Sequence, residues 1–169
     1  MIPNYQVLML PLLKAVKDQK EYKLNDIVDI LANEFKLSEE ERKELLPSGQ
    51  SFLFGNRVGW ARTYLKKAGL LDSPKRGYLI ITQRGLDVLK QKPKEVNVAL
   101  LQQFSEFLEF QSSKRDDNIT ENTIVQSESI QTPEEILENS YQDIRKSLAQ
   151  ELLDKITKLS PTFFERLVV

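Results

Sequence analysis

The 169-residue sequence contains no cysteine and no histidine. Without a thiol or an imidazole, the chain cannot carry cysteine catalysis, a Ser-His triad, a histidine metal site or a zinc finger. Carboxylates are the only side chains left that could hold a catalytic metal ion. The lack of cysteine also agrees with a reducing compartment, and we expect the protein to be cytoplasmic.

Long apolar runs are missing as well. One of the longest, Val7 to Leu13, is far shorter than the ~20 residues that a membrane span requires, and Pro11 interrupts it. No basic segment precedes this run, so the sequence predicts neither a signal peptide nor a membrane partner. With 40% apolar and 29% charged residues, the composition is typical of a soluble protein with a folded core.

The charges are unevenly distributed, although the whole chain has a net charge of only −1. Residues 1–92 carry a net charge of +5, and residues 93–169 carry −6. The excess is greatest in residues 55–92, which hold nine Lys or Arg side chains against two acids. A polyanion such as DNA would therefore bind the first half of the chain.

Residues 56–85 have the pattern of a helix, a hairpin and a second helix. Val58, Ala61 and Leu65 recur at helical spacing, and Gly69 is typical of the residue that ends a helix. Residues 73–77 have turn composition, and the apolar segments 70–71 and 78–81 on either side predict two short strands. The fold class that this pattern predicts is mainly α, a winged helix-turn-helix with a two-stranded wing.

In a winged helix, the helix before the hairpin enters the major groove of DNA and the wing lies along the backbone or in the minor groove. The candidate groove contacts are Asn56, Arg57, Thr63 and Lys67, with Arg57 suited to guanine. Five cations are better suited to phosphates: Lys66, Lys67, Lys75, Arg76 and Arg84. Arg62 is a further candidate DNA-binding side chain. Trp60 and Tyr64 could stack on bases, but aromatic residues in such a helix are more often part of the core.

Residues 56–71, Asn-Arg-Val-Gly-Trp-Ala-Arg-Thr-Tyr-Leu-Lys-Lys-Ala-Gly-Leu-Leu, resemble the recognition segment of the N-terminal domain of Mrr-like restriction endonucleases. The resemblance covers roughly residues 2–92. It implies a DNA-binding domain from a type IV, modification-dependent restriction system that attacks methylated foreign DNA. It also implies a separate nuclease domain, for which a divalent metal such as Mg²⁺ is expected. Residues 160–169 resemble the first helix of that nuclease domain, so we expect the chain to stop before the catalytic strands.

One acidic motif could suggest catalysis in the chain itself. Restriction-type nucleases use an Asp and a Glu-x-Lys, and Glu41-Arg42-Lys43 has this spacing after Asp26 or Asp29. However, Ser38 lies three residues before Glu41, which is the spacing of a capping box at the start of a helix. We therefore predict no catalytic residue, metal ligand or cofactor in this chain.

The remaining sequence divides into four predicted regions. A winged-helix domain covers residues 1–110, with further helices at about 3–17, 25–35, from Ser38 onward, 83–91 and 96–110. The segment 47–54 either positions the recognition helix or only packs Phe52 and Phe54. Residues 111–131 are polar and predict a flexible linker, followed by a long amphipathic helix at 132–159 and the start of the nuclease domain at 160–169.

Several alternatives stay open at this point. The apolar stripe of the 132–159 helix could pack on its own domain, on the nuclease domain, or on a second copy in a homodimer. The protein could also be a dimeric winged-helix transcriptional regulator, or a winged helix that binds another protein. A DNA-binding domain predicts binding that weakens steeply with salt, whereas a protein-binding module does not.

Overall fold

The computed structural model describes residues 1–113 and 130–157. The chain divides into two compact units, Met1–Thr132 and Pro133–Val169. The predicted linker therefore lies mostly outside the described residues, and the predicted start of a nuclease domain at 160–169 lies wholly outside them. None of the described helices is both long and apolar enough to cross a lipid bilayer.

The first unit begins with helix α1, Tyr5–Ala15, which is two residues shorter at each end than predicted. It starts where the side chain of Asn4 accepts hydrogen bonds from the backbone N–H groups of Gln6 and Val7. Helix α2 spans Leu24–Glu34, and the short helix α3 spans Glu39–Lys43. The predicted capping box is present at α3, because Ser38 and Glu41 each bind the other's backbone N–H.

Helix α4, Leu53–Lys67, is the predicted recognition helix, and it starts three residues before Asn56. Of the two phenylalanines that the preceding loop could pack, Phe54 is buried and Phe52 is exposed. The helix ends as expected at Gly69, which has a positive φ of 72°. The N–H groups of Gly69 and Leu70 turn back to the carbonyls of Lys66 and Leu65, each at 2.9 Å, and close the last turn.

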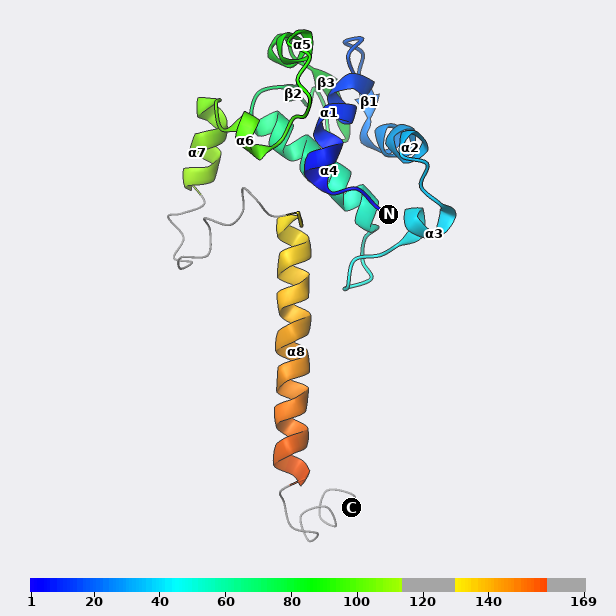
Figure 1. The fold of residues 1–169 in the computed structure, drawn as a ribbon, viewed down its shortest axis with the longest axis vertical. Helices are drawn as coiled ribbons and strands as arrows, with labels where there is room; N and C mark the ends of the chain where they lie inside the picture. Colours follow the sequence, from blue (N-terminus) through cyan, green and yellow to red (C-terminus); the bar gives the residue numbers. More distant parts are fainter. Residues whose placement is uncertain (114–129, 158–169) are drawn as a thin grey trace. The chain divides into compact units, whose positions relative to one another are not determined.

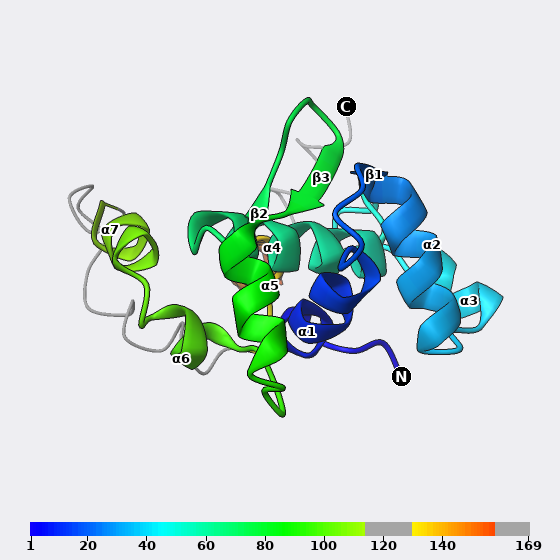
Figure 2. The same ribbon diagram turned by 90° about the horizontal axis from the view of Figure 1, so that it is seen from above.

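The sheet has three antiparallel strands in the order β1-β3-β2, one more than the predicted wing (Figure 2). Strands β2, Leu71–Asp72, and β3, Tyr78–Ile81, form the predicted hairpin, which we call the wing (residues 71–81). Strand β1, Tyr22–Lys23, pairs with the other edge of β3, and Tyr22 lies opposite Leu79. Two residues are too few to show the alternating pattern of a strand, so the sequence alone did not indicate β1.

Helix α5, Gln83–Lys90, follows the wing and is capped by Thr82, whose hydroxyl accepts a hydrogen bond from the N–H of Gly85. The single helix predicted at 96–110 is wrong. The structure has α6, Val98–Leu101, and α7, Ser105–Ser113, separated by a turn at 102–104. The turn redirects the chain so that Phe107 packs edge-on against Tyr64 of α4, a contact that periodicity does not reveal. Helix α7 also extends three residues into the predicted linker.

The core of this unit lies where α1, α2 and α4 meet (Figure 1). Its largest fully buried side chains include Tyr5, Leu12, Ile27 and Leu65. Burial of this kind stabilises a fold by roughly 25 cal/mol for each Å² of apolar surface removed from water. The core thereby fixes the position of α4.

The second unit contains helix α8, Pro133–Thr157, which confirms most of the long helix predicted at 132–159. Figure 1 shows it as one uninterrupted helix. The last two predicted residues lie outside the described part of the chain.

Candidate nucleic-acid interface

Helix α4 buries one side and presents the other outward. Its buried side chains are Phe54, Val58, Ala61, Tyr64 and Leu65. Spacings of three and four residues place a different set on the opposite side, which we call the outward face: Asn56, Gly59, Thr63, Lys66 and Lys67. Lys66 and Lys67 are exposed in the last turn, where the helix dipole favours cations. This end of α4 is therefore cationic.

The middle of the outward face carries little side-chain bulk. A Cβ atom added at Gly59 would meet nothing within 4 Å, so the residue faces open space. The hydroxyl of Thr63 donates a hydrogen bond to the carbonyl of Gly59 at 2.9 Å. A glycine inside a helix costs about 0.5–1 kcal/mol relative to alanine, and no neighbouring side chain requires it here.

Asn56, at the start of the outward face, is engaged within its own unit. Its Oδ1 accepts a hydrogen bond from the hydroxyl of Thr132 at 3.0 Å, and Thr132 is completely buried. The end of the first unit thus lies against the side chain predicted to read a DNA groove. The two residues are 76 positions apart in the chain, so no local sequence pattern indicated this contact.

Arg57 holds the N-terminal segment in place. Its Nη1 donates to the carbonyl of Ile2 at 3.0 Å and to that of Pro3 at 3.2 Å. These bonds tie the residues before α1 to α4. The predicted bidentate contact of Arg57 with guanine stays a prediction.

Arg62 joins α4 to the wing. Its Nη2 donates to the hydroxyl of Ser73 at 2.9 Å, and Ser73 is the first residue of the turn after β2. The Nε of Arg62 is buried and has no hydrogen-bond partner among the described residues. This bond fixes the basic wing beside the basic end of α4.

The wing tip carries the two predicted cations, in different surroundings. Lys75 pairs with Glu21 at 2.9 Å and lies 4.0 Å above the ring of Tyr78. The hydrogen bond that Lys75 donates to Glu21 raises the pKa of Lys75, so this amine is fully charged at neutral pH. Arg76 is exposed at the tip. Gly77, with φ of 81°, completes the turn, and its carbonyl accepts a hydrogen bond from Leu24 at the start of α2.

Arg84 links three elements rather than extending freely from α5. It donates to the carbonyl of Ala68 at 3.0 Å and to Glu106 of α7 at 2.8 Å, and its guanidinium lies 5.3 Å from the ring centre of Phe104. The hydrogen bond from Arg84 lowers the pKa of Glu106 to about 2. Arg84 therefore stabilises the end of α4, and its predicted phosphate contact stays a prediction.

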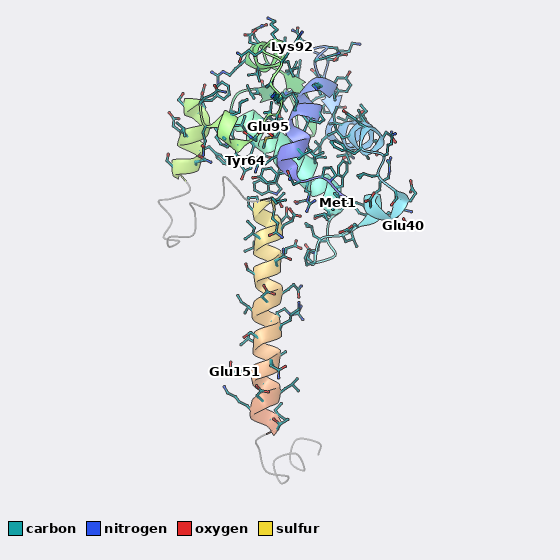
Figure 3. All side chains as sticks on the ribbon, in the orientation of Figure 1. Met1, Glu40, Tyr64, Lys92, Glu95 and Glu151 are labelled. Atoms are coloured by element: carbon teal, nitrogen blue, oxygen red, sulfur yellow. The ribbon has the colours of Figure 1, made fainter. Side chains whose placement is uncertain are left out.

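The aromatic side chains of α4 belong to the core and its edge. Tyr64, labelled in Figure 3, is buried and packs against Tyr5, Phe107 and Phe110 at ring-centre distances of 5.3, 5.6 and 6.2 Å. Burial raises the pKa of its hydroxyl. Trp60 is partly buried, 5.9 Å from Tyr64. The core interpretation of Tyr64 is confirmed.

The comparison with protein families agrees with this geometry. Residues 5–91 match the model of the Mrr N-terminal domain, which is more than half of the chain. The chain belongs to the Mrr N-terminal domain family. It is also 25% identical, over 175 aligned positions, to the type IV methyl-directed restriction enzyme EcoKMrr of Escherichia coli strain K12. The alignment covers 99% of this chain but only 57% of that relative, and no solved structure gives a significant match.

All nine predicted DNA-binding residues lie inside the Mrr N-terminal domain, on α4, the wing and α5. The structure brings Lys66, Lys67 and Arg62 together on one helix and holds the wing beside them. Lys67 lies 4.9 Å above the ring of Phe110, so α7 also contacts this surface. The sequence did not indicate Glu21, Ser73 and Glu106 as partners of the cations, or Thr132 as the partner of Asn56, because polar contacts between distant segments leave no periodic pattern.

Glu41, the residue of the superficial nuclease motif, has a structural role in the Mrr N-terminal domain. Besides its part in the capping box, it pairs with the N-terminal amine of Met1. That hydrogen bond and the one from the Ser38 backbone hold the pKa of Glu41 below its usual value. In the described parts of the chain, no three acidic side chains are grouped so that they could hold a metal ion.

Proposed function

We propose that this Mrr N-terminal domain binds double-stranded DNA through the outward face of α4 and through the wing. The observation that carries the proposal is the hydrogen bond between Arg62 and Ser73, which ties the base of the wing to α4. Helix and wing then form one basic surface, as phosphate binding requires. In this arrangement α4 lies in the major groove and the wing follows the backbone.

The proposal extends to methylated DNA, because the relative EcoKMrr is described as methyl-directed. It also assigns this chain to a type IV restriction endonuclease whose cleavage, with the Mg²⁺ that it needs, takes place outside residues 1–169. A homodimer formed through α8 is the last part of the proposal.

The test is fluorescence anisotropy of the chain with methylated and unmethylated duplexes over a salt series. We expect affinity to fall steeply with salt, and the double variant Lys66→Ala/Lys67→Ala and the variant Arg76→Ala to flatten the slope by about one unit for each phosphate-binding cation removed. Lys94→Ala is the matched control, since Lys94 is an exposed cation outside α4 and the wing. These variants avoid Arg57 and Arg84, whose loss would disturb the fold.

Two results would overturn parts of the proposal. If the chain binds no duplex at low salt, the proposal of DNA binding is wrong, and the protein-binding alternative gains support. Equal affinity for methylated and unmethylated duplexes would remove methylation sensing from this domain while leaving DNA binding in place.

A further inference from the structure

One side of α8 is lined with apolar side chains that are exposed to solvent. Leu137, Tyr141, Ile144, Leu148 and Leu152 are each more than half exposed, and Ile156 continues the same line. Their spacing of three to four residues places them along one stripe of the helix. Figure 3 shows the side chains of α8 projecting away from the helix along its length. A stripe of this length is typical of a helix that pairs with another helix.

The charges of α8 are separated along its axis. Residues 133–143 contain four acids and no cation, whereas residues 144–157 contain three cations and two acids. Two copies side by side in the same direction would place acidic halves against each other. Two copies in opposite directions separate the two acidic segments, and each then lies beside a segment that carries less negative charge, which reduces the repulsion between flanking charges.

The stripe also matches itself when one copy is reversed. We consider two antiparallel copies whose two-fold axis passes between residues 146 and 147. Leu137 of one copy then lies opposite Ile156 of the other, and Tyr141 opposite Leu152. Ile144 lies within one residue of the position opposite Leu148. The same alignment places Glu138 opposite Lys155, twice in each pair of helices. In the single chain Lys155 pairs with Glu151 of its own helix, and both side chains are more than half exposed.

We propose that two copies of this chain pair through α8 in antiparallel orientation, with the stripe from Leu137 to Ile156 as the interface. The orientation rests on the homodimer proposed above but not on DNA binding. The apolar match sets the register, and the pairing of Glu138 with Lys155 agrees with it. A dimer of this kind carries two DNA-binding domains.

The first test is the mass of the chain in solution without DNA, measured by sedimentation equilibrium. We expect a monomer–dimer equilibrium for the natural sequence and a monomer for Leu148→Glu, which places a charge at the centre of the stripe. Gln150→Glu introduces the same charge on the opposite side of α8 and should leave the dimer intact. Circular dichroism verifies that both variants retain their helix content. A natural chain that is monomeric at every concentration, or equal effects of the two variants, would overturn the proposal.

The second test establishes the orientation by cross-linking. Since the chain has no cysteine, Leu137→Cys and Ile156→Cys each introduce a unique thiol. When the two variants are mixed and oxidised, with a tag on one to distinguish their masses, we expect a disulfide between position 137 of one copy and 156 of the other. If 137 instead links mainly to 137, the helices run parallel and the proposed orientation is wrong. Both tests omit DNA, so a failure of DNA binding leaves their results unchanged.

Discussion

The guanidinium of Arg62 and the hydroxyl of Ser73 lie 2.9 Å apart and join α4 to the wing by a hydrogen bond. The Nε of Arg62 is buried and has no hydrogen-bond partner among the described residues. The bond from Nη2 to Ser73 therefore helps to hold the guanidinium in one position. The two elements of the proposed interface are thereby held in one arrangement before any DNA is present. Such preorganisation lowers the entropy cost of binding.

Ser73→Ala should weaken both the fold and the binding of DNA. Removing a hydrogen bond to a charged group costs about 1.5–3 kcal/mol, which urea denaturation measures. Anisotropy should show a lower affinity for duplex DNA with an unchanged salt slope, because the number of cations stays the same. Ser147→Ala, an exposed serine of α8, is the control and should change neither quantity appreciably. If Ser73→Ala leaves affinity unaltered, the wing does not need this bond to bind DNA.

The ion pair between Arg84 and Glu106 predicts how stability depends on pH. The pKa of Glu106 is about 2 in the folded chain, below the 4.5 of a glutamate without these contacts. The folded state therefore favours the ionised carboxylate. The contribution of this pair is present above about pH 4.5 and is lost as the pH falls toward 2. As the pH falls from about 4.5 to 2, we expect the free energy of unfolding to decrease less for Glu106→Gln than for the natural chain.

Urea denaturation at a series of pH values measures this difference. Glu109→Gln serves as the control, because Glu109 is an exposed carboxylate of the same helix with no ion pair among the described residues. A natural chain and a Glu106→Gln variant with parallel pH curves would show that the ion pair contributes nothing to the fold.

Much of the fold was predictable because local rules determine it. The end of α4 at Gly69 and the capping box of Ser38 and Glu41 each follow from residues within a few positions of one another. The break between α6 and α7 was not predictable, because it depends on where Phe107 must lie to meet Tyr64. Strand β1 was missed for a similar reason, since its pairing partner is more than 50 residues away.

The candidate site was predictable in its residue types but not in its contacts. Charge density pointed to cations that the structure places on α4, the wing and α5, and their role in binding DNA stays a prediction. It gave no indication that Arg57 binds the carbonyls of Ile2 and Pro3, or that Arg84 binds Glu106. A count of cations treats all of them as available to phosphates, whereas the folded chain uses several to connect its own elements.

Two helical glycines should respond in opposite ways to the same substitution. Gly59→Ala should raise the free energy of unfolding by about 0.5–1 kcal/mol, because its Cβ meets open space and alanine favours helix. Gly85→Ala should lower it by about 1–3 kcal/mol, since its Cβ would lie 2.3 Å from the carbonyl oxygen of Leu70. If the outward face of α4 enters a groove, Gly59→Ala should also reduce DNA affinity despite its greater stability. Urea denaturation and anisotropy on the same samples separate the two effects.

Glu21 should lower the DNA affinity of the wing, because its carboxylate competes with DNA phosphate for the ammonium group of Lys75. In the free chain Lys75 lies 2.9 Å from Glu21. Glu21→Gln removes the competing charge, and we expect affinity at low salt to rise by up to about fivefold, the range set by exposed ion pairs. The salt slope should become steeper by up to about one unit, as one more cation becomes available to phosphate.

Two further variants show whether this effect passes through Lys75. Glu34→Gln removes an exposed acid of α2 outside the wing and should change affinity little. In a Lys75→Ala background, Glu21→Gln should lose most of its effect, since the lysine that it would free is absent. An equal gain in both backgrounds would mean that Glu21 acts only through the overall charge of the domain, and the specific competition at the wing tip would then be wrong.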